Sequence, residues 1–406
     1  MNTENNVIRQ VVGLDAHSRK LEFSIWNVTK DFEMEKSKPS KTISGEIQSL
    51  ESIIKEHTIE GAEIVFEAST NSFAISERIN KLGREAVVVK SDTVKNYSPQ
   101  YKVTDKTDAA NLARARIAGL TTRVYIPSNK EQAYRTIVHA YMGATKDSVR
   151  LSNRIWGFCS ENFLPLHRNL SMAAADRLLE EAHDVLDDTR CWILTDLVWR
   201  YKNALATELH YNEMISNIVM HEPMMLKLLQ VLGVGPVIAF TMVAYIGDIK
   251  RFATPKRLCA YIGVVPSINA SGERESKNHR LARSGIPIVK AMLAQGAQAA
   301  LRSGKLPIHT WARHIAARRQ CRNIAVMALA RKMVMYIWHI MMGHPITYKE
   351  MPNGIETKTY KIASKIGKER RTKLGYKTVK ELSEAMVNQI MSNIVVKVVE
   401  TNPPAS

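Results

Sequence analysis

The chain has 406 residues, of which 45% are hydrophobic and 24% charged, and it carries a formal net charge of +18. This composition is typical of a globular protein, and it excludes a mostly disordered chain, a collagen and a small disulfide scaffold. The length suggests two or three domains. The four cysteines lie at least thirty residues apart, which leaves no CxxC box and fits a reducing cytoplasm.

The positive charge is concentrated in one part of the chain. Residues 250–340 contain 17 lysines and arginines and two acids, Glu273 and Glu275, whereas the other 315 residues have an excess of only three basic residues. Because like charges repel, such a concentration predicts a face that binds a polyanion, nucleic acid first. An inert basic surface is the alternative.

The first 127 residues alternate between predicted strands and helices. Apolar runs at residues 11–14, 64–66 and 86–89 and an alternating pattern at 21–25 predict four strands. Helical patterns cover residues 47–54, 73–82 and 105–120, the last opened by Thr104. This order predicts an α/β domain with a mixed sheet.

The rest of the chain is predicted to be mostly helical. Residues 128–225 have the apolar spacing of long helices, with one predicted apolar stripe formed by Leu178, Ala182, Val185 and Trp192. Such helices pair either as a coiled coil between subunits or within one monomer. Residues 226–345 form a third region with a loop between 263 and 285, and residues 346–406 a basic tail with one helix near 379–394. The uncharged run 228–247 has the length of a membrane span, but Gly233 to Pro236 interrupt it, which favours a buried helical hairpin.

Four carboxylates are placed where catalytic groups collect. Asp15 and Glu67 each follow a predicted strand directly, and Asp105 and Asp108 share one face at the start of a helix. Clustered acids repel one another unless a cation neutralises them, and oxygen ligands suit Mg²⁺ or Mn²⁺. The sequence therefore predicts a metal site, with solvated charges as the alternative.

Three further stretches carry features of phosphate chemistry. Residues 232–239 (LGVGPVIA) predict a helix-hairpin-helix whose Gly233 and Gly235 admit a phosphate, or else a plain tight turn. Ser271 precedes a glycine in the most basic stretch and is a candidate nucleophile, although most Ser-Gly pairs are only turns. The candidate phosphate contacts are Arg274, Lys277, Arg280, Arg283, and the helical pair Arg331 and Lys332, for which a solvated face is equally consistent.

These elements, in this order, resemble the DEDD-type transposases of bacterial insertion sequences, relatives of the Piv site-specific DNA invertase. The resemblance covers residues 8–345. In the N-terminal part it rests on GLD at 13–15, FEA at 66–68 and TDKTDAANLA at 104–113. In the C-terminal part it rests on 232–239, IGD at 246–248, AYIG at 260–263, Val265-Pro266, Ser271-Gly272 and ALARK at 328–332. Residues 283–287 depart from the family because they lack an expected asparagine.

The resemblance implies a fold and a set of roles. It implies an RNase H-like, RuvC-like domain, a helical coiled-coil segment and a second, mostly helical domain that supplies a serine. Asp15, Glu67, Asp105 and Asp108 match the metal-binding acids of the family, and Ser271 matches the serine that becomes linked to DNA. The family acts in the bacterial cytoplasm on nucleoid DNA, as dimers or tetramers without a membrane, guided by a bridge RNA that pairs with donor and target DNA.

The resulting hypothesis is a metal-dependent DNA recombinase that cuts and rejoins strands through a phosphoserine intermediate. Such an exchange conserves the phosphodiester energy in the protein–DNA link, and the sequence contains no Walker motif for ATP. Two alternatives stay open. One is a RuvC-like nuclease in which water attacks and Ser271 is structural. The other is a protein that binds nucleic acid without catalysis.

Overall fold

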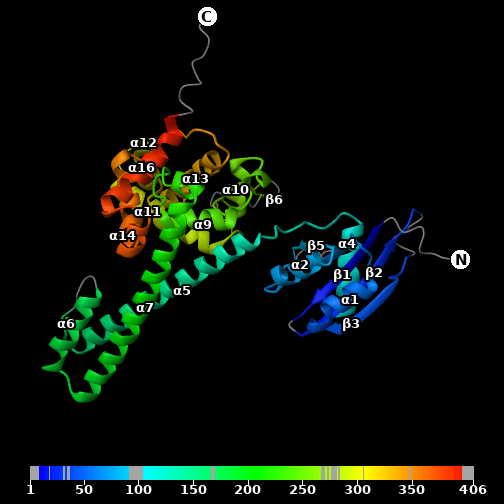
Figure 1. The fold of residues 1–406 in the computed structure, drawn as a ribbon, viewed down its shortest axis with the longest axis horizontal. Helices are drawn as coiled ribbons and strands as arrows, with labels where there is room; N and C mark the ends of the chain where they lie inside the picture. Colours follow the sequence, from blue (N-terminus) through cyan, green and yellow to red (C-terminus); the bar gives the residue numbers. More distant parts are fainter. Residues whose placement is uncertain are drawn as a thin grey trace, which may run out of the picture. The chain divides into compact units, whose positions relative to one another are not determined.

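The computed structural model describes residues 9–17, 19–30, 33, 37–90, 104–165, 170–266, 270–271, 274–275, 281, 284–304, 306–346 and 349–395. The chain divides into two compact units, residues 1–128 and 129–406 (Figure 1). The first unit is a mixed α/β unit and the second consists almost entirely of helices. This agrees with the α/β-then-helical order that the sequence predicts.

The first unit is built on a five-stranded sheet with the order β3-β2-β1-β4-β5. Its strands are β1 (Arg9–Ala16), β2 (Lys20–Val28), β3 (Lys41–Glu46), β4 (Glu63–Glu67) and β5 (Glu85–Val89). Strands β1 to β3 pair antiparallel, while β1, β4 and β5 are parallel. Four of these strands were predicted. Strand β3 was not predicted, because this exposed edge strand (KTISGE) contains a single large apolar residue.

Each face of this sheet is covered by helices. Successive apolar side chains of a strand point to opposite faces, so both faces need to be covered. On one face Val12 and Leu14 pack with residues of a short 3₁₀ turn (Ile47–Ser49), α1 (Leu50–His57) and α2 (Ser72–Lys81). On the other face Val11 packs with Leu112 of α4 (Asp105–Ile117). The three predicted helices are therefore all present, and they form two hydrophobic layers around the sheet.

Helix α4 lies in direct backbone contact with β1. A Cβ atom added to Gly13 would lie 1.8 Å from the carbonyl oxygen of Ala109, so no residue larger than glycine fits at this position. Thr104 caps the helix by accepting a hydrogen bond from the Thr107 N–H at 3.3 Å, and this fixes where α4 begins. The first turn of α4 is thereby held near the end of β1.

The second unit begins with a long helical hairpin. Helices α5 (Asn129–Glu161) and α7 (Asp188–His221) run side by side, and α6 (Met172–His183) packs against them at one end (Figure 1). The long helices thus pair within the chain, one of the two arrangements left open above. The predicted apolar stripe is partly wrong: α6 ends at His183, so Val185 and Trp192 leave the packed seam and are 64% and 72% exposed.

The rest of the second unit is a helical bundle around one large core. Its elements are α8 (Pro223–Leu228), α9 (Pro236–Ile246), a 3₁₀ turn (Ile249–Arg251), α10 (Pro255–Ile262), β6 (Ala270–Ser271), β7 (Arg274–Glu275), α11 (Pro287–Ser303), α12 (Pro307–Arg319), α13 (Arg322–Met341), α14 (Pro352–Lys365), α15 (Lys368–Lys373) and α16 (Val379–Val395). Helix α13 is long and apolar enough to span a membrane, but Leu329, Met333 and Ile337 lie buried in this core.

The region expected to be a basic tail packs on the same core. Ile355 and Ile362 of α14 and Met386 of α16 are buried in it. The predicted helix near residues 379–394 is present, whereas α14 and α15 were not predicted. Their charged residues stand between the apolar ones and mask the helical period, and the core contact becomes visible only in three dimensions.

Replacing Gly13 with alanine tests the contact between β1 and α4. The added methyl group must push α4 away from the sheet, and we expect a loss of about 1–3 kcal/mol in unfolding free energy. The measurement is urea unfolding followed by circular dichroism. Gly143→Ala, on α5 with no atom within 4 Å of the added Cβ, is the matched control and should not lower stability. Equal stability of Gly13→Ala and the wild type would contradict the contact.

Candidate metal centre and nucleic-acid interface

Asp15 and Glu67 lie at the same edge of the sheet. Strands β1 and β4 are parallel with Gly13 opposite Val65, and continuing that register by two residues places Asp15 level with Glu67. Both acids have the parity of Val11 and Val65, which belong to the cluster on the α4 face. Strand pairing and alternation therefore bring these two predicted acids together on the side where α4 begins.

Helix α4 adds Asp105 and Asp108 to this edge. Both stand in its first turn, where carboxylates are stabilised by the helix dipole. Their negative charges raise the pKa of Asp15, after the larger effect of its burial, so they lie within electrostatic reach of that carboxyl. The contact at Gly13 sets this distance. The structure thus brings Asp15, Asp105 and Asp108 within electrostatic reach of one another, and the strand register places the backbone of Glu67 at the same edge.

Two carboxyls of this cluster, those of Asp15 and Asp108, have raised pKa values. Burial raises the pKa of Asp15 from its ordinary value, and His17 partly opposes this shift. Burial and then Asp105 raise the pKa of Asp108. Both shifts mean that the ionised forms are disfavoured and that a cation at this edge would relieve them.

Glu63, at the opposite end of β4, shows the contrast. Burial would raise its pKa, but hydrogen bonds from Arg9 and Arg116 outweigh burial and lower it. The ion-pair partner that the structure gives Asp15 and Asp105 is instead a histidine. Glu63 is thus a neutralised structural acid, whereas no arginine or lysine pairs with Asp15 or Asp108 among the described residues, and the pKa of each of these two carboxyls is raised.

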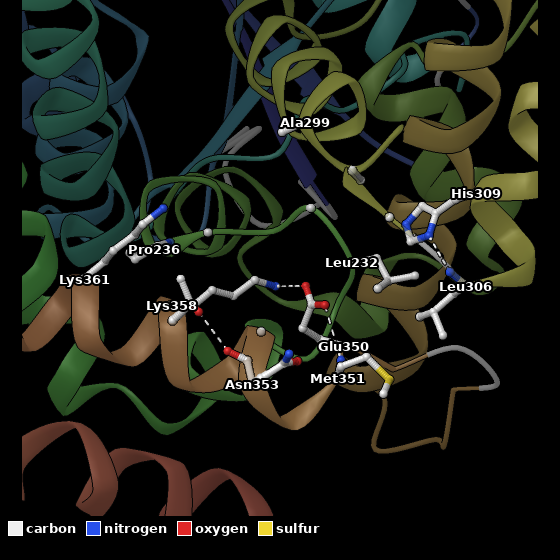
Figure 2. Close-up of a pocket in the computed structure, with 16 residues that line it drawn as sticks. Leu232, Pro236, Ala299, Leu306, His309, Glu350, Met351, Asn353, Lys358 and Lys361 are labelled. Carbon is white, nitrogen blue, oxygen red and sulfur yellow. Dashed lines mark hydrogen bonds and ion pairs between the residues drawn. The ribbon is translucent and has the colours of Figure 1, made fainter. Parts of the chain in front are cut away.

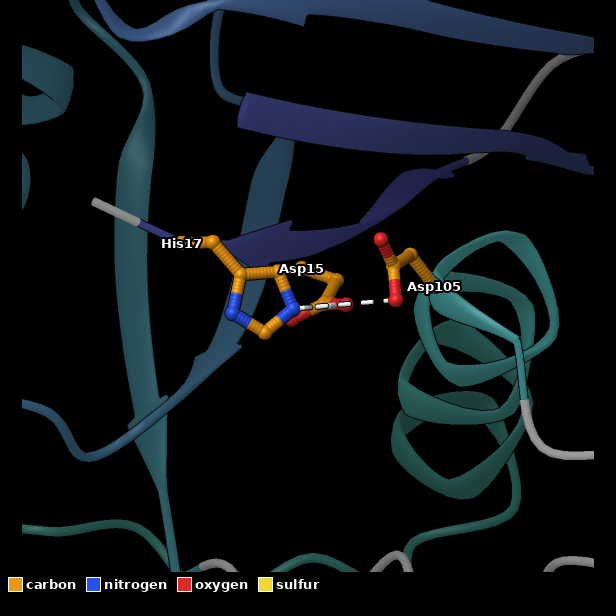
Figure 3. Close-up of side chains that lie close together, drawn as sticks. All are labelled: Asp15, His17 and Asp105. Atoms are coloured by element: carbon orange, nitrogen blue, oxygen red, sulfur yellow. Dashed lines mark ion pairs between the residues drawn. The ribbon is translucent and has the colours of Figure 1, made fainter. Parts of the chain in front are cut away.

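The donor atoms nearest to one another come from Asp15, His17 and Asp105, all within 4.8 Å (Figure 3). His17 Nε2 lies 3.2 Å from Asp15 Oδ2 and 3.7 Å from Asp105 Oδ1. His17 was not predicted as a site residue, although its position two residues after Asp15 was a visible signal. Carboxylate and imidazole donors at these separations fit a divalent cation.

The two glycines of the predicted helix-hairpin-helix turn have different surroundings. The turn joins α8 to α9, as predicted. Gly233 has a φ of +73°, and a Cβ there would lie 2.6 Å from the carbonyl oxygen of Gly296 on α11. Gly235 is extended, and nothing lies within 4 Å of the corresponding position. Gly233 is therefore required for packing, while Gly235 leaves open space before the uncapped start of α9.

A cavity of about 690 Å³ opens beside this turn (Figure 2). Lys358 lies on its wall and its ammonium donates to the carbonyls of Leu229 and Val231 at 2.8 and 3.0 Å. The ammonium also pairs with Glu350 at 2.8 Å. Burial lowers the pKa of Lys358 against the opposing effect of Glu350. This network fastens α14 to the end of α8 and sets one wall of the cavity.

His309 contributes an unsatisfied donor to the opposite wall. It is 2% exposed, and its Nδ1 accepts a hydrogen bond from the Leu306 N–H at 3.1 Å. Burial, and then the charge of Arg313, lower its pKa, so the neutral ring carries its proton on Nε2. Within the described part of the chain, Nε2 has no partner. Neither His309 nor Lys358 was identified from the sequence.

The loop that carries Ser271 is closed at its base. The Ile286 N–H donates to the Ile262 carbonyl at 3.1 Å, and Pro266 forms an antiparallel bridge with Leu281. Further out, Ser271 and Arg274 pair across the two-stranded ribbon of β6 and β7. The described backbone thus places Ser271 in a short antiparallel ribbon.

The other predicted basic contacts are only partly described. Lys277, Arg280 and Arg283 lie outside the described residues, and Arg274 is described by its backbone. Arg331 and Lys332 are half-buried on α13. The Lys332 ammonium lies 5.8 Å from the centre of the Trp311 ring. Arg331 lies beside Cys259, and burial raises the pKa of the Cys259 thiol to about 11. These two residues are therefore not a fully solvated face.

Comparisons with known proteins indicate one class, the transposases. The chain is 23% identical over 240 residues to a putative transposase, y4qE, of Sinorhizobium fredii. It is 27% identical over 271 residues to the transposase for insertion sequence element IS1111A of Coxiella burnetii. It is 22% identical over 284 residues to a probable family 20 transposase of Pseudomonas aeruginosa. In the same order, these matches cover 57%, 64% and 68% of this chain and 56%, 72% and 83% of the relatives. The match to the Sinorhizobium protein thus spans just over half of that protein's length.

One segment of the chain matches a family model. Residues 225–311 match the family model described as Transposase IS116/IS110/IS902 family. This segment is similar to that family of insertion-sequence transposases, which agrees with the transposase resemblance inferred from the sequence. The matched range includes the turn at Gly233 and Gly235 and the Ser271 loop.

The two glycines of the turn give a matched pair of variants. Gly233→Ala must strain a left-handed backbone and move α11, and we expect a loss of about 1–3 kcal/mol in unfolding free energy. Gly235→Ala meets open space and should change stability by less than ~0.5 kcal/mol. Thermal unfolding of both variants makes the comparison. Equal destabilisation by the two substitutions would contradict the difference in their surroundings.

Proposed function

We propose that this protein is the transposase of an insertion sequence of the IS116/IS110/IS902 type, which cuts and rejoins DNA strands in the bacterial cytoplasm. The observation that carries the proposal is the cluster of Asp15, Glu67, Asp105 and Asp108, in a chain whose second unit matches the transposase domain. Neither part suffices alone: the acids supply the chemistry, and the matched domain indicates DNA as the substrate.

The first unit is proposed to have the RNase H-like, RuvC-like fold. The support is the sheet order β3-β2-β1-β4-β5, with three antiparallel strands followed by two parallel ones. The support also includes the position of the acids, two at the ends of the central strands β1 and β4 and two at the start of α4. In this arrangement the acids face a substrate that lies along the edge of the sheet.

The four acids are proposed to hold Mg²⁺ or Mn²⁺. The fit rests on the donor set, since carboxylate oxygens are the ligands of these hard cations and the raised pKa of Asp15 and of Asp108 marks uncompensated charge. When bound, such an ion offsets the negative charge that develops on a phosphate during displacement. Asp15 and Asp105 orient the site, because β1 and α4 fix their backbones on either side of the Gly13 contact.

Ser271 is proposed to be the nucleophile. Its hydroxyl gives up a proton, an Oγ–P bond forms, the P–O bond to one deoxyribose breaks, and the released sugar hydroxyl takes up a proton. Attack by a sugar hydroxyl on the phosphoserine reverses these steps and joins the strands. Arg274, Lys277, Arg280 and Arg283 are expected to offset the charge on the phosphate. The support from the fold is the two-stranded ribbon, in which the backbone of Ser271 pairs with that of Arg274.

Nucleic-acid contacts are proposed for the matched domain. The uncapped start of α9, the open space at Gly235 and the donor of His309 favour a backbone phosphate in the adjoining cavity. Arg331 and Lys332 are proposed as further contacts. The partners are donor and target DNA and a guiding bridge RNA, for which the excess positive charge of residues 250–340 is the support.

The protein is proposed to act as a homodimer or homotetramer. Trp192 and Trp199 stand seven residues apart on one side of α7 and are 72% and 65% exposed. Large aromatic side chains are enriched at protein interfaces and costly to leave in water. The α5–α7 hairpin therefore offers a surface for a second copy, in addition to the pairing within the chain.

Covalent capture tests the proposed chemistry. The full chain is purified with the RNA transcribed from the flanking DNA, mixed with element-junction and target DNA and Mg²⁺, and quenched in detergent. We expect a protein–DNA adduct with the wild type and a loss of at least about 100-fold with Ser271→Ala and with Asp15→Asn. Glu60→Gln, an exposed acid before β4, is the matched control and should keep the adduct.

The same experiment separates the alternatives. Cleaved DNA without an adduct, in both the wild type and Ser271→Ala, would sink the serine mechanism and favour a hydrolytic nuclease. DNA binding without metal-dependent strand breakage, unchanged by Asp15→Asn, would leave a protein that only binds nucleic acid.

A further inference from the structure

His17 faces two of the acids from a position fixed by the backbone. It follows β1 directly, and its N–H donates to the Lys20 carbonyl at 2.9 Å, which closes the turn into β2. From there a single ring nitrogen, Nε2, lies 3.2 Å from Asp15 and 3.7 Å from Asp105 (Figure 3). The two carboxylates belong to different elements, β1 and α4. The imidazole therefore connects the same two elements that are in backbone contact at Gly13.

An ordinary surface ion pair does not explain this arrangement well. The His17 side chain is 59% exposed and that of Asp105 54% exposed, and pairs between such solvated groups contribute little stability. A histidine beside an acid also occurs at His183 and Asp184, where the two neighbours lie 3.7 Å apart on a surface with no second acid in the pair. At His17 one nitrogen and oxygens of two carboxylates lie within 4.8 Å of one another, so that donor atoms from three side chains could surround one cation.

The chemical consequence concerns which cation the site prefers. Mg²⁺ takes oxygen ligands and keeps its water, whereas imidazole nitrogen suits transition metals and binds Mn²⁺ more readily than Mg²⁺. A donor set of carboxylate oxygens alone does not discriminate strongly between the two ions. One added nitrogen shifts the balance toward Mn²⁺ without changing the charge of the site.

We propose that His17 is a direct ligand of the metal in this site, which makes the donor set a mixed oxygen and nitrogen one and gives the protein a preference for Mn²⁺ over Mg²⁺. This inference rests on the proposed function in one respect, that the carboxylates bind a divalent cation. It assigns to this chain a ligand beyond the four acids. Neutral imidazole is the ligating form, with the ring Nδ1 left for solvent or a neighbouring acceptor.

Pulsed electron paramagnetic resonance of bound Mn²⁺ tests the assignment. A directly bound imidazole nitrogen gives a ¹⁴N modulation of the Mn²⁺ spin echo, which oxygen ligands and water do not give. The full-length protein, without DNA, is loaded with substoichiometric Mn²⁺ and compared with His17→Ala. His183→Ala, which removes an exposed histidine beside a single acid, is the matched control.

We expect the ¹⁴N modulation in the wild type and in His183→Ala, and its loss in His17→Ala. The Mn²⁺ affinity of His17→Ala, measured by titration of the free ion, should fall about tenfold, while the Mg²⁺ affinity measured by competition changes less than about twofold. A modulation that survives in His17→Ala, or its absence in the wild type with Mn²⁺ bound, overturns the assignment.

Asp15→Asn separates this inference from the proposed function. If Asp15→Asn abolishes Mn²⁺ binding and the wild type gives no ¹⁴N modulation, the carboxylate site stands and only the role of His17 fails. If Mn²⁺ does not bind the wild type, or binds Asp15→Asn equally well, the carboxylate site itself fails and the role of His17 fails with it.

Discussion

The contact between the backbone of α4 and β1 at Gly13 is the constraint on which the candidate active site depends. With 1.8 Å between the Ala109 oxygen and the place of a Cβ, any side chain at this position would separate the helix from the sheet. Asp105 and Asp108 would then lie farther from Asp15 and Glu67. A structural feature of the hydrophobic layer thus determines the spacing of the charged groups, and the two cannot be altered independently.

The two ends of the central strands show how the same residue type serves opposite purposes. At one end Glu63 is held by arginines and its pKa is lowered, so that it contributes to the fold in its ionised form. At the other end burial and mutual repulsion raise the pKa of Asp15 and of Asp108. Ionised carboxylates that are buried and repel one another lower the stability of the fold unless a cation neutralises them. Such a loss of stability is typical of functional sites.

Much of this arrangement could be predicted from the sequence, because strand runs and the Thr104 cap locate the acids at strand ends and at a helix start. The role of Gly13 could not be predicted, because it depends on a contact with Ala109, almost a hundred positions away in the sequence. The same holds for His309 and Lys358, whose significance depends on burial. Trp192 was assigned to a packed stripe because the period continued past the true end of α6, and local patterns do not reveal such a break.

The most direct test of the central claim is to locate the cation on the chain. Fe²⁺ in place of Mg²⁺, with ascorbate and peroxide, generates hydroxyl radicals that cut the backbone beside the bound ion, and mass spectrometry identifies the cuts. We expect cuts near residues 15–17, 67 and 105–108, all of them lost in Asp15→Asn. Cuts confined to other segments, or a pattern unchanged by Asp15→Asn, would contradict it.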